Sequence, residues 1–361
     1  MKILRSLLPA LALLASAACA DRDDDTAIDA DPDPHGVAFL YHHVSAETPP
    51  STSVTPETFA SHLEWLADHD YRVWELQRLL RAVLDGAEPV PERVVAITFD
   101  DAWVSVFEKA APLLEERNWP YTIFVNSDAV DEGLEPAMSW DQLRALAERG
   151  AAIENHGASH AYLARRPADV DEQAWHERIR ADVERGHERL AEEIGVAPSL
   201  FAYPYGEADE TVAAIVGEHY AFALEQRSGA IGPGSDPLRL PRYPMATAFA
   251  SLDRLATAAS SLPMAVRSVE LRPRNRPAGA SPESLRLEFS GEVPAGLACF
   301  TAGGRSLDVA VQGKAAVVDA DGVGRPGRNK INCTAPAGEG RYRWFSWQWL
   351  QPRPDGSWPA G

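Results

Sequence analysis

Two neighbouring carboxylates are the first residues whose types suggest chemistry. Asp100 and Asp101 directly follow the apolar run at residues 94–99, which is typical of a buried strand. In an enzyme, one carboxylate of such a pair can bind a metal ion while the other moves protons. A lone Asp-Asp pair is more often a helix cap with its neighbour, so this motif by itself leaves both interpretations open.

Two histidines four residues apart follow another apolar run, at residues 151–154. On a helical turn, His156 and His160 would share one face and could chelate one cation. With ten histidines in 361 residues, this spacing arises by chance about 0.3 times, so the position after a strand carries more weight than the spacing. An aspartate with two histidines leaves one coordination position open for water, as catalytic zinc sites do.

An aromatic turn, Phe-Ala-Tyr-Pro-Tyr-Gly at residues 201–206, ends a third apolar run. Its proline and glycine force a turn that exposes aromatic faces and backbone N–H groups, although such turns are also common where they only pack. Because parallel strands end at one edge of a sheet or barrel, the three segments are expected to meet there.

Short apolar runs alternate with longer amphipathic segments from residue 37 onward. The runs predicted to be strands are residues 37–41, 94–99, 121–125, 151–154 and 200–203. Helix signals lie between them: Thr55 before a proline, a capping box of Ser139 and Gln142, and a charged helix over residues 169–194 that Gly195 ends. Continuous apolar strands favour a parallel sheet, so we predict a wound α/β sheet or an incomplete β/α barrel.

A second, smaller domain is predicted after residue 262. Residues 285–289, 298–301, 315–318 and 342–350 are β-type runs separated by turn residues. They would form a small antiparallel sandwich. Within it, Phe345, Trp347 and Trp349 alternate onto one face, which is either core or a surface on which sugars stack.

The N-terminus carries the features of an export signal. Lys2 and Arg5 precede the apolar residues 7–18, which favours a secretory signal over residues 1–20. Small residues before Cys19 resemble a lipoprotein signal in which this cysteine is lipidated; the alternative is cleavage near it and release of a soluble protein. Residues 21–36 are predicted to be an acidic linker.

Export also affects the interpretation of the other cysteines. Cys299 and Cys333 form an even pair in an oxidising compartment, which predicts a disulfide, with two unpaired buried thiols as the alternative. We expect a periplasmic or outer-membrane lipoprotein, or a secreted protein. The sequence thus divides into a domain at 37–262 and a β-rich domain at 263–361.

Charge excludes one class of partner. The chain has 34 Lys and Arg against 53 Asp and Glu, a formal net charge of -19. Such a charge repels nucleic-acid phosphates and anionic headgroups, so no nucleic-acid partner is expected and membrane contact only through the N-terminal lipid.

Three motifs together resemble those of a known enzyme family. Residues 98–101, 156–160 and 203–206 are similar, in this order, to the first three motifs of the polysaccharide deacetylases of the NodB-homology, carbohydrate esterase family 4 type. Residues 41–44 and 201–207 resemble more particularly the poly-β-1,6-N-acetylglucosamine deacetylase branch, whose motifs are circularly permuted. The resemblance covers about residues 37–262 and implies a distorted, incomplete (β/α) barrel of the NodB type.

The resemblance also implies roles for single residues. Asp101, His156 and His160 would bind one divalent metal ion, with zinc expected and nickel, cobalt or iron as alternatives. Asp100 would be the general base. The backbone N–H of Tyr205 would stabilise the oxyanion, and Tyr203 and Arg242 would belong to the same substrate-binding group.

Two departures from the family pattern concern the acid and the base. No histidine follows His219, so the usual late Leu-x-His motif is absent, and the permuted branch implies His42 as general acid instead. Ala202 stands where most members have an arginine that orients the base. Arg242 is a candidate replacement, or else a surface residue of a proline-rich loop.

The expected function is metal-dependent removal of acetyl groups from an N-acetylated bacterial polysaccharide, with an exopolysaccharide as the expected substrate. One alternative is a carbohydrate-binding or scaffold protein with a degenerate deacetylase barrel. The other is a deacetylase that acts on peptidoglycan or on O-acetyl groups.

Overall fold

The computed structural model describes residues 33–272 and 278–359 of the chain. The predicted signal peptide, Cys19 and nearly all of the acidic linker lie outside these residues. Within them, no helix has the length and apolar character needed to cross a membrane.

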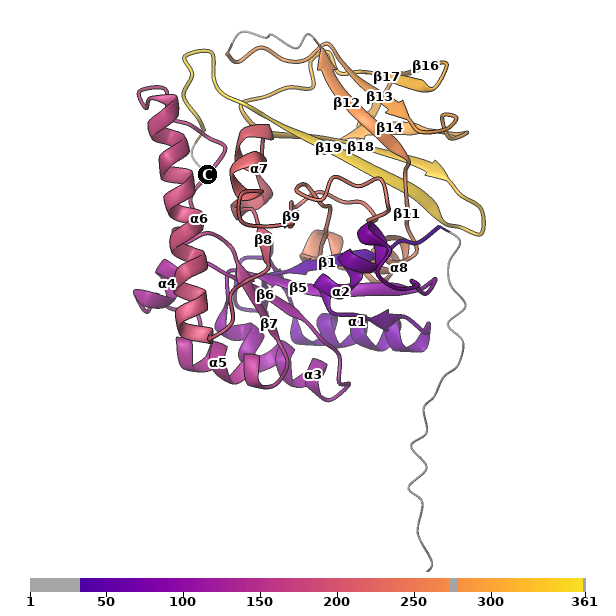
Figure 1. The fold of residues 1–361 in the computed structure, drawn as a ribbon. Coiled ribbons are helices and arrows are strands. Elements are labelled where there is room, and N and C mark those ends of the chain that lie inside the picture. The colour runs from indigo at the N-terminus through magenta and orange to yellow at the C-terminus, as the bar shows by residue number, and fades with distance from the viewer. Residues whose placement is uncertain (1–32, 273–277, 360–361) are drawn as a thin grey trace, which may run out of the picture.

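One parallel sheet forms the first domain (Figure 1). Its strands are β1 (Val37–Tyr41), β4 (Arg72–Val73), β5 (Val94–Asp100), β6 (Thr122–Val125), β7 (Ala152–Asn155), β8 (Leu200–Ala202), β9 (Phe222–Leu224) and β10 (Tyr243–Pro244). Their order is β10-β1-β5-β6-β7-β8-β9, with β4 beside β5. The chain just before β10 also reaches back to β9 through a parallel bridge between Leu224 and Leu240. The sheet therefore curls into the incomplete (β/α) barrel that the sequence predicts.

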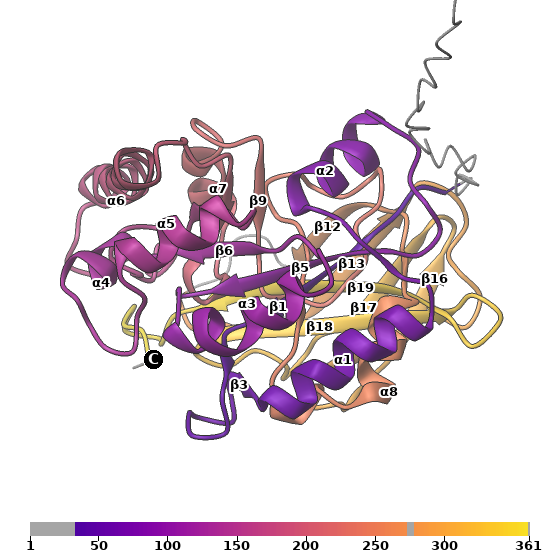
Figure 2. The same cartoon turned by 90° about the horizontal axis from the view of Figure 1, so that it is seen from below.

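Successive residues of the strands belong alternately to two hydrophobic cores, one on each face of the sheet. Val37, Phe39 and Tyr41 belong to the core under the helices, whereas Ala38 and Ala96 belong to the smaller inner one. The helices are α1 (Pro56–Asp68), α2 (Leu76–Leu80), α3 (Ala111–Glu115), α4 (Ser127–Asp131), α5 (Trp140–Glu148), α6 (Glu172–Ile194), α7 (Glu210–Val216) and α8 (Leu252–Ala259). Figures 1 and 2 show α1, α3 and α5 together on the outer face of the sheet. Burial on both faces explains why the strands are continuously apolar.

The caps predicted at Thr55, Ser139 and Gly195 are confirmed, and α6 begins at Glu172 rather than at residue 169. The side chain of Thr55 accepts a hydrogen bond from the Thr58 N–H, and Ser139 and Gln142 form the capping box that begins α5. Gly195, with φ of 81°, ends α6 in the left-handed conformation that glycine adopts without strain.

Two antiparallel sheets form the β-rich domain. The first has the order β11 (Leu262–Pro263), β19 (Tyr342–Gln351), β18 (Gly327–Pro336), β14 (Ala298–Thr301) and β15 (Ser306–Leu307), in which only the short β11 is parallel to its neighbour. The second has the order β12 (Val266–Arg272), β13 (Ser284–Phe289), β17 (Ala315–Asp319) and β16 (Val309–Gln312). The expected small sandwich is confirmed, and we propose the domain boundary close to Leu262.

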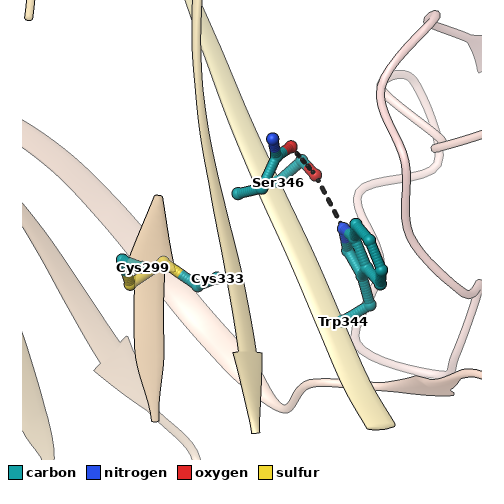
Figure 3. Close-up of a disulfide and its surroundings, with 5 residues drawn as sticks. Cys299, Cys333, Trp344 and Ser346 are labelled. Atoms are coloured by element: carbon teal, nitrogen blue, oxygen red, sulfur yellow. Dashed lines mark hydrogen bonds between the residues drawn. A yellow bond between two sulfur atoms is a disulfide. The ribbon is translucent and has the colours of Figure 1, made fainter. Parts of the chain in front are cut away.

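The predicted disulfide is also confirmed. Cys299 on β14 and Cys333 on β18 are register partners and are joined, with their Cα atoms 4.1 Å apart (Figure 3). Both cysteines are buried in the sandwich core, where the bond crosslinks two neighbouring strands.

The aromatic stripe of β19 is core rather than a free surface. Trp349 is buried in the sandwich, and Phe345 and Trp347 are partly buried against the same core. On the other face, the Trp344 indole donates a hydrogen bond to the Ser346 hydroxyl (Figure 3). The structure thus favours the packing interpretation of this stripe.

The β18–β19 pair also contacts the loops that follow β8 and β9. Lys330 Nζ donates to the Gln226 carbonyl at 2.9 Å, and Gln348 Nε2 donates to the Gly206 carbonyl at 2.5 Å. Arg328 donates to the Tyr205 carbonyl. The second domain therefore rests directly on the carboxyl-end edge of the barrel.

Candidate functional site

The two aspartates separate at the end of β5. Asp101 and Ala102 both have left-handed backbones, with φ of 73° and 54°. Non-glycine residues in this region store about 1 kcal/mol or more each and cluster at functional sites. Within the described residues, neither Asp100 nor Asp101 accepts a hydrogen bond from a backbone N–H, so the pair is not a helix cap.

Asp101, His156 and His160 form a candidate metal site. Asp101 Oδ1 lies 3.1 Å from His160 Nε2 and 3.4 Å from His156 Nε2, and the three ligand atoms all lie within 4.8 Å of one another. Asp101 Oδ1 and His156 Nε2 are buried and have no hydrogen-bond partner among the described residues. Such orphaned atoms are costly, and a cation held between them would satisfy both. The residues present therefore fit a divalent ion.

His156 is oriented by a backbone carbonyl. Its Nδ1 lies 2.7 Å from the Ala202 oxygen, and a carbonyl can only accept, so the proton is on Nδ1. The lone pair of Nε2 then faces Asp101, as in metal-ligating histidines whose other nitrogen is held by a protein acceptor. Ala202, which stands where the deacetylase motif has an arginine, thus still contributes to the site through its backbone carbonyl.

The two histidines lie on a loop, and the expectation of a helical turn is wrong. Residues 156–160 include Gly157 with φ of 75° and His160 with φ of 54°, which a right-handed helix does not allow. The loop nevertheless brings both rings together, with their centroids 5.0 Å apart.

Asp182 on α6 holds this loop, although no sequence motif indicates it. Its carboxylate accepts hydrogen bonds from the N–H groups of Ala158 at 3.1 Å and Ser159 at 3.0 Å. A Cβ at Gly157 would lie 2.8 Å from Asp182 Oδ2, so the glycine is needed there. The available signal was an acidic residue on the buried face of a long helix, next to Val183.

Arg242 binds both oxygens of Asp100. Arg242 Nη1 lies 2.7 Å from Oδ1 and Nη2 lies 2.8 Å from Oδ2, and both side chains are fully buried. Arg242 comes from the segment that connects β9 to β10 at the gap of the barrel, which brings it to the inside. The surface alternative for Arg242 is therefore wrong, and the arginine occupies the place beside the base candidate.

The ionisation of Asp100 follows from these neighbours. Burial raises the pKa of Asp100, but the positive charge of Arg242 and the hydrogen bonds that it donates outweigh burial and lower the pKa overall. Asp100 is therefore an ionised carboxylate at neutral pH and can accept a proton.

His42 follows β1 next to the aspartates. Tyr41 pairs with Phe99 across β1 and β5, so His42 and Asp100 occupy adjacent positions at the same strand ends. Burial lowers the pKa of His42, and the negative charges of Asp101 and Asp100 partly oppose that shift.

His43 supports the site through a neighbour. Its ring stacks on Trp103 with centroids 4.3 Å apart, and Trp103 Nε1 donates to Asp101 Oδ2 at 3.2 Å. His43 therefore packs behind a residue that holds the second oxygen of Asp101.

The two tyrosines of the aromatic turn differ in position. Tyr205 has φ of 59°, stacks on Tyr162 at 3.7 Å, and lies 4.5 Å from the His160 ring. Tyr203 is fully buried and donates its hydroxyl proton to the Leu238 carbonyl at 2.8 Å. The side chain of Tyr203 cannot contact a ligand, which corrects the expectation that it lines the site.

Gln226, which no motif indicated, is a second neighbour of Asp100. Its Nε2 donates to Asp100 Oδ2 at 3.3 Å. A Cβ at Gly206 would come within 2.4 Å of the Gln226 backbone nitrogen, so the glycine lets the two loops approach. Nothing local in the sequence marks Gln226, because its contact spans 126 residues.

The arrangement combines an ionised carboxylate, a candidate metal site and a histidine at one edge of the barrel. These are the parts needed for hydrolysis of an acyl bond by an activated water molecule.

Comparison with known proteins agrees with this chemistry. Residues 87–221 match the sequence profile of the polysaccharide deacetylase family. The chain is 26% identical over 212 residues to the poly-β-1,6-N-acetyl-D-glucosamine N-deacetylase of Staphylococcus aureus (strain MRSA252), covering 56% of this chain and 71% of that protein. The Escherichia coli (strain K12) protein of the same name is 24% identical over 225 residues, covering 52% of this chain and 33% of that one.

Solved structures share the barrel. IcaB from Ammonifex degensii is 26% identical with a TM-score of 0.55, covering 63% of this chain and 96% of IcaB. The Streptococcus pyogenes deacetylase PplD has a TM-score of 0.56 at 19% identity, covering 63% of this chain and 99% of PplD, which shows a common fold. The motifs, the barrel and these matches together identify the chain as one that carries a polysaccharide deacetylase domain.

Proposed function

We propose that the protein removes acetyl groups from an N-acetylated exopolysaccharide, in a reaction that depends on one divalent metal ion. The relatives named as poly-β-1,6-N-acetyl-D-glucosamine N-deacetylases suggest a polymer of N-acetylglucosamine. The observation that carries the proposal is the buried Asp100–Arg242 pair beside the Asp101, His156 and His160 cluster.

The metal ligands in this proposal are Asp101, His156 and His160, for which zinc is the expected ion. When bound, the ion would make a water molecule more acidic and polarise the acetyl carbonyl. Asp100 accepts the proton of the attacking water. Arg242 keeps that carboxylate ionised and fixes both of its oxygens.

Two further groups act on the acetyl oxygen and on the amide nitrogen. The backbone N–H of Tyr205, in its left-handed turn, donates to the oxygen that becomes negative in the tetrahedral intermediate. His42 donates a proton to the leaving amine, which would otherwise depart as an unstable anion. The new products are acetate and a free amino group on the sugar.

We also propose export, with Cys19 as the site of lipidation. A disulfide between Cys299 and Cys333 supports an oxidising compartment, since such bonds are rare in the cytosol. Labelling of the chain with a fatty-acid precursor, lost in Cys19→Ser, tests this assignment.

The experiment for the main proposal measures acetate release from a soluble β-1,6-linked N-acetylglucosamine oligosaccharide. Treatment with a chelator should abolish release, and added zinc should restore it. Undiminished release from demetallated protein would contradict metal dependence, and no release from any acetylated glycan would contradict the function.

The role of His42 has a separate test. His42→Ala should lose most activity on the amide but much less on an activated acetyl ester, whose leaving group needs no proton. His176→Ala, a change of the same type on the surface of α6, should affect neither substrate. Equal losses on both substrates would remove His42 from the acid role.

A further inference from the structure

A cavity of about 490 Å³ lies beside the candidate metal site, between the two domains. Tyr162 and Tyr205 line it from the barrel, and residues 325–328 with Lys330 line it from the β-rich domain. The Tyr205 ring is 4.5 Å from the ring of His160, so the cavity begins directly next to a candidate metal ligand. Its volume is within the range of about 300–1,000 Å³ that small-molecule sites have.

The walls of this cavity are strongly cationic. Arg165, Arg325, Arg328 and Lys330 line it, whereas Glu207 is the single carboxylate in its wall. Glu207 is already neutralised, because Arg165 binds both of its oxygens at 2.7 Å.

The other three cations have no carboxylate as an ion-pair partner. Within the described part of the chain, Arg325, Arg328 and Lys330 form no ion pair. Burial lowers the pKa of Lys330 to about 8, with a smaller contribution from the charge of Arg328 that the charge of Glu225 opposes. Three cations without an ion pair in one cavity are unexpected in a chain of net charge -19.

Donors remain available for a ligand. Lys330 donates one hydrogen bond to the Gln226 carbonyl, and Arg328 donates one to the Tyr205 carbonyl. A lysine ammonium has three N–H donors and an arginine guanidinium has five, so both side chains keep donors for a ligand. The Arg325 guanidinium makes no hydrogen bond to the described residues. Carboxylates and sulfate or phosphate esters are the groups that such donors bind best.

We propose that this cavity binds an anionic group of the polysaccharide, on a sugar close to the one that is deacetylated. The inference rests on the proposed function and narrows its substrate class to acidic N-acetylated glycans. A deacetylated sugar carries an ammonium group, which the same cations repel, so the cavity also favours release of product over substrate.

The test is equilibrium binding to the full-length, metal-loaded Asp100→Asn protein, in which turnover is blocked. The probes are a tetrasaccharide of alternating glucuronate and N-acetylglucosamine, a neutral N-acetylglucosamine tetramer, and the same tetramer with one 6-sulfate. At least one acidic probe should bind about tenfold more tightly than the neutral one at low salt, and the difference should shrink at high salt. The tighter acidic probe tells whether the anion is a ring carboxylate or an ester.

Variants connect the preference to the cavity. Arg325→Gln should weaken binding of the tighter acidic probe about three- to tenfold and change that of the neutral probe less than twofold. Arg325 is exposed, so the variant should fold, and Arg328→Gln provides a second probe of the same wall. Lys314→Gln, an equal charge change in the exposed turn after β16, should have no effect.

Acidic probes that bind no better than the neutral tetramer, or a preference that Arg325→Gln and Arg328→Gln leave intact, would overturn the proposal. Acetate release from all three N-acetylated probes by the wild-type protein is measured in parallel, and the function fails if none of them releases acetate. That measurement judges the proposed function by itself, so the two proposals can fail separately.

Discussion

Asp100 and Asp101 are neighbours in the chain but have different partners. Both oxygens of Asp100 accept hydrogen bonds from Arg242. In Asp101, one oxygen accepts a hydrogen bond from Trp103 and the other lies beside the two histidines. The left-handed backbone of Asp101 ends the strand directly after Asp100, and the two carboxylates bind different partners. Two identical side chains thereby acquire two chemical environments.

Arg242 is predicted to be a positioning residue for the base. Arg242→Met leaves a buried carboxylate without its counter-charge, so the free energy of unfolding should fall by about 3–5 kcal/mol and kcat by about 10²-fold. Arg242→Lys keeps the charge but loses the two-point contact with Asp100. Its free energy of unfolding and its kcat should therefore lie between those of the wild type and Arg242→Met. Denaturant melts, kcat, KM and metal content measured together check this.

A purely structural role predicts a different result. In that case the folded fraction of either Arg242 variant would retain the wild-type kcat at full metal content.

At the scale of elements, the parts that the sequence predicts are those with local causes. The strands of the barrel are continuous apolar runs, and the capping box of Ser139 and Gln142 acts within one turn. Strand β18 is not predicted from the sequence; in it, Gly327 and Asn329 occupy buried positions and Arg328 and Lys330 alternate with them. The side chains of β18 that face the sandwich core are partly polar, and those on the other face contact the barrel domain. The sequence of this strand therefore lacks the clear alternation of apolar and polar residues that predicts a strand.

The candidate site divides in the same way. The aspartates and histidines are found from motifs, because their two motifs lie at the carboxyl ends of β5 and β7. Asp182 and Gln226 are not, because their contacts join elements that are distant in the chain and depend on how α6 and β9 pack.

Asp182 is predicted to control the histidine loop. Asp182→Ala removes the acceptor of two loop N–H groups and should weaken metal binding about 10- to 100-fold, as loss of groups behind metal ligands does. Glu188→Gln, on the exposed face of the same helix, is the control and should bind metal normally. Metal titration monitored by calorimetry measures both, and equal affinities would mean that the loop needs no support from α6.

The disulfide is predicted to stabilise the β-rich domain. It joins residues 34 apart, so its removal in the Cys299→Ser, Cys333→Ser double variant should lower the free energy of unfolding by about 3–4 kcal/mol in the chain-entropy model. Urea unfolding monitored by tryptophan fluorescence measures the change. Two titratable thiols in the unreduced, denatured wild-type protein would show that the bond does not form.

At the scale of the whole molecule, the second domain is part of the site. Lys330, Arg328 and Gln348 bind carbonyls of the loops that carry Gln226 and Tyr205. Figures 1 and 2 show β18 and β19 crossing the barrel on this side. Movement between the domains would therefore disturb the surroundings of Asp100 as well as the cationic cavity.

Lys330 makes stability depend on pH at this junction. Its pKa is lowered from 10.5 to about 8 in the folded state, mainly by burial, so between these values the unfolded chain binds more protons. Stability of the wild type relative to Lys330→Met should therefore be lowest and constant below about pH 8, and should rise by on the order of 2 kcal/mol towards pH 10.5. Urea unfolding of both proteins from pH 7 to 10.5 tests this, and a constant difference would contradict it.

The most direct test of the whole account separates the two aspartates. Wild type, Asp100→Asn and Asp101→Asn are compared for bound divalent metal and for acetate released from an N-acetylated oligosaccharide. We expect about one ion per chain in the wild type and in Asp100→Asn, with acetate release lower by 10²- to 10⁴-fold in Asp100→Asn, and weakened metal binding in Asp101→Asn. A wild-type protein that holds its metal but releases acetate no faster than Asp100→Asn would contradict the deacetylase mechanism.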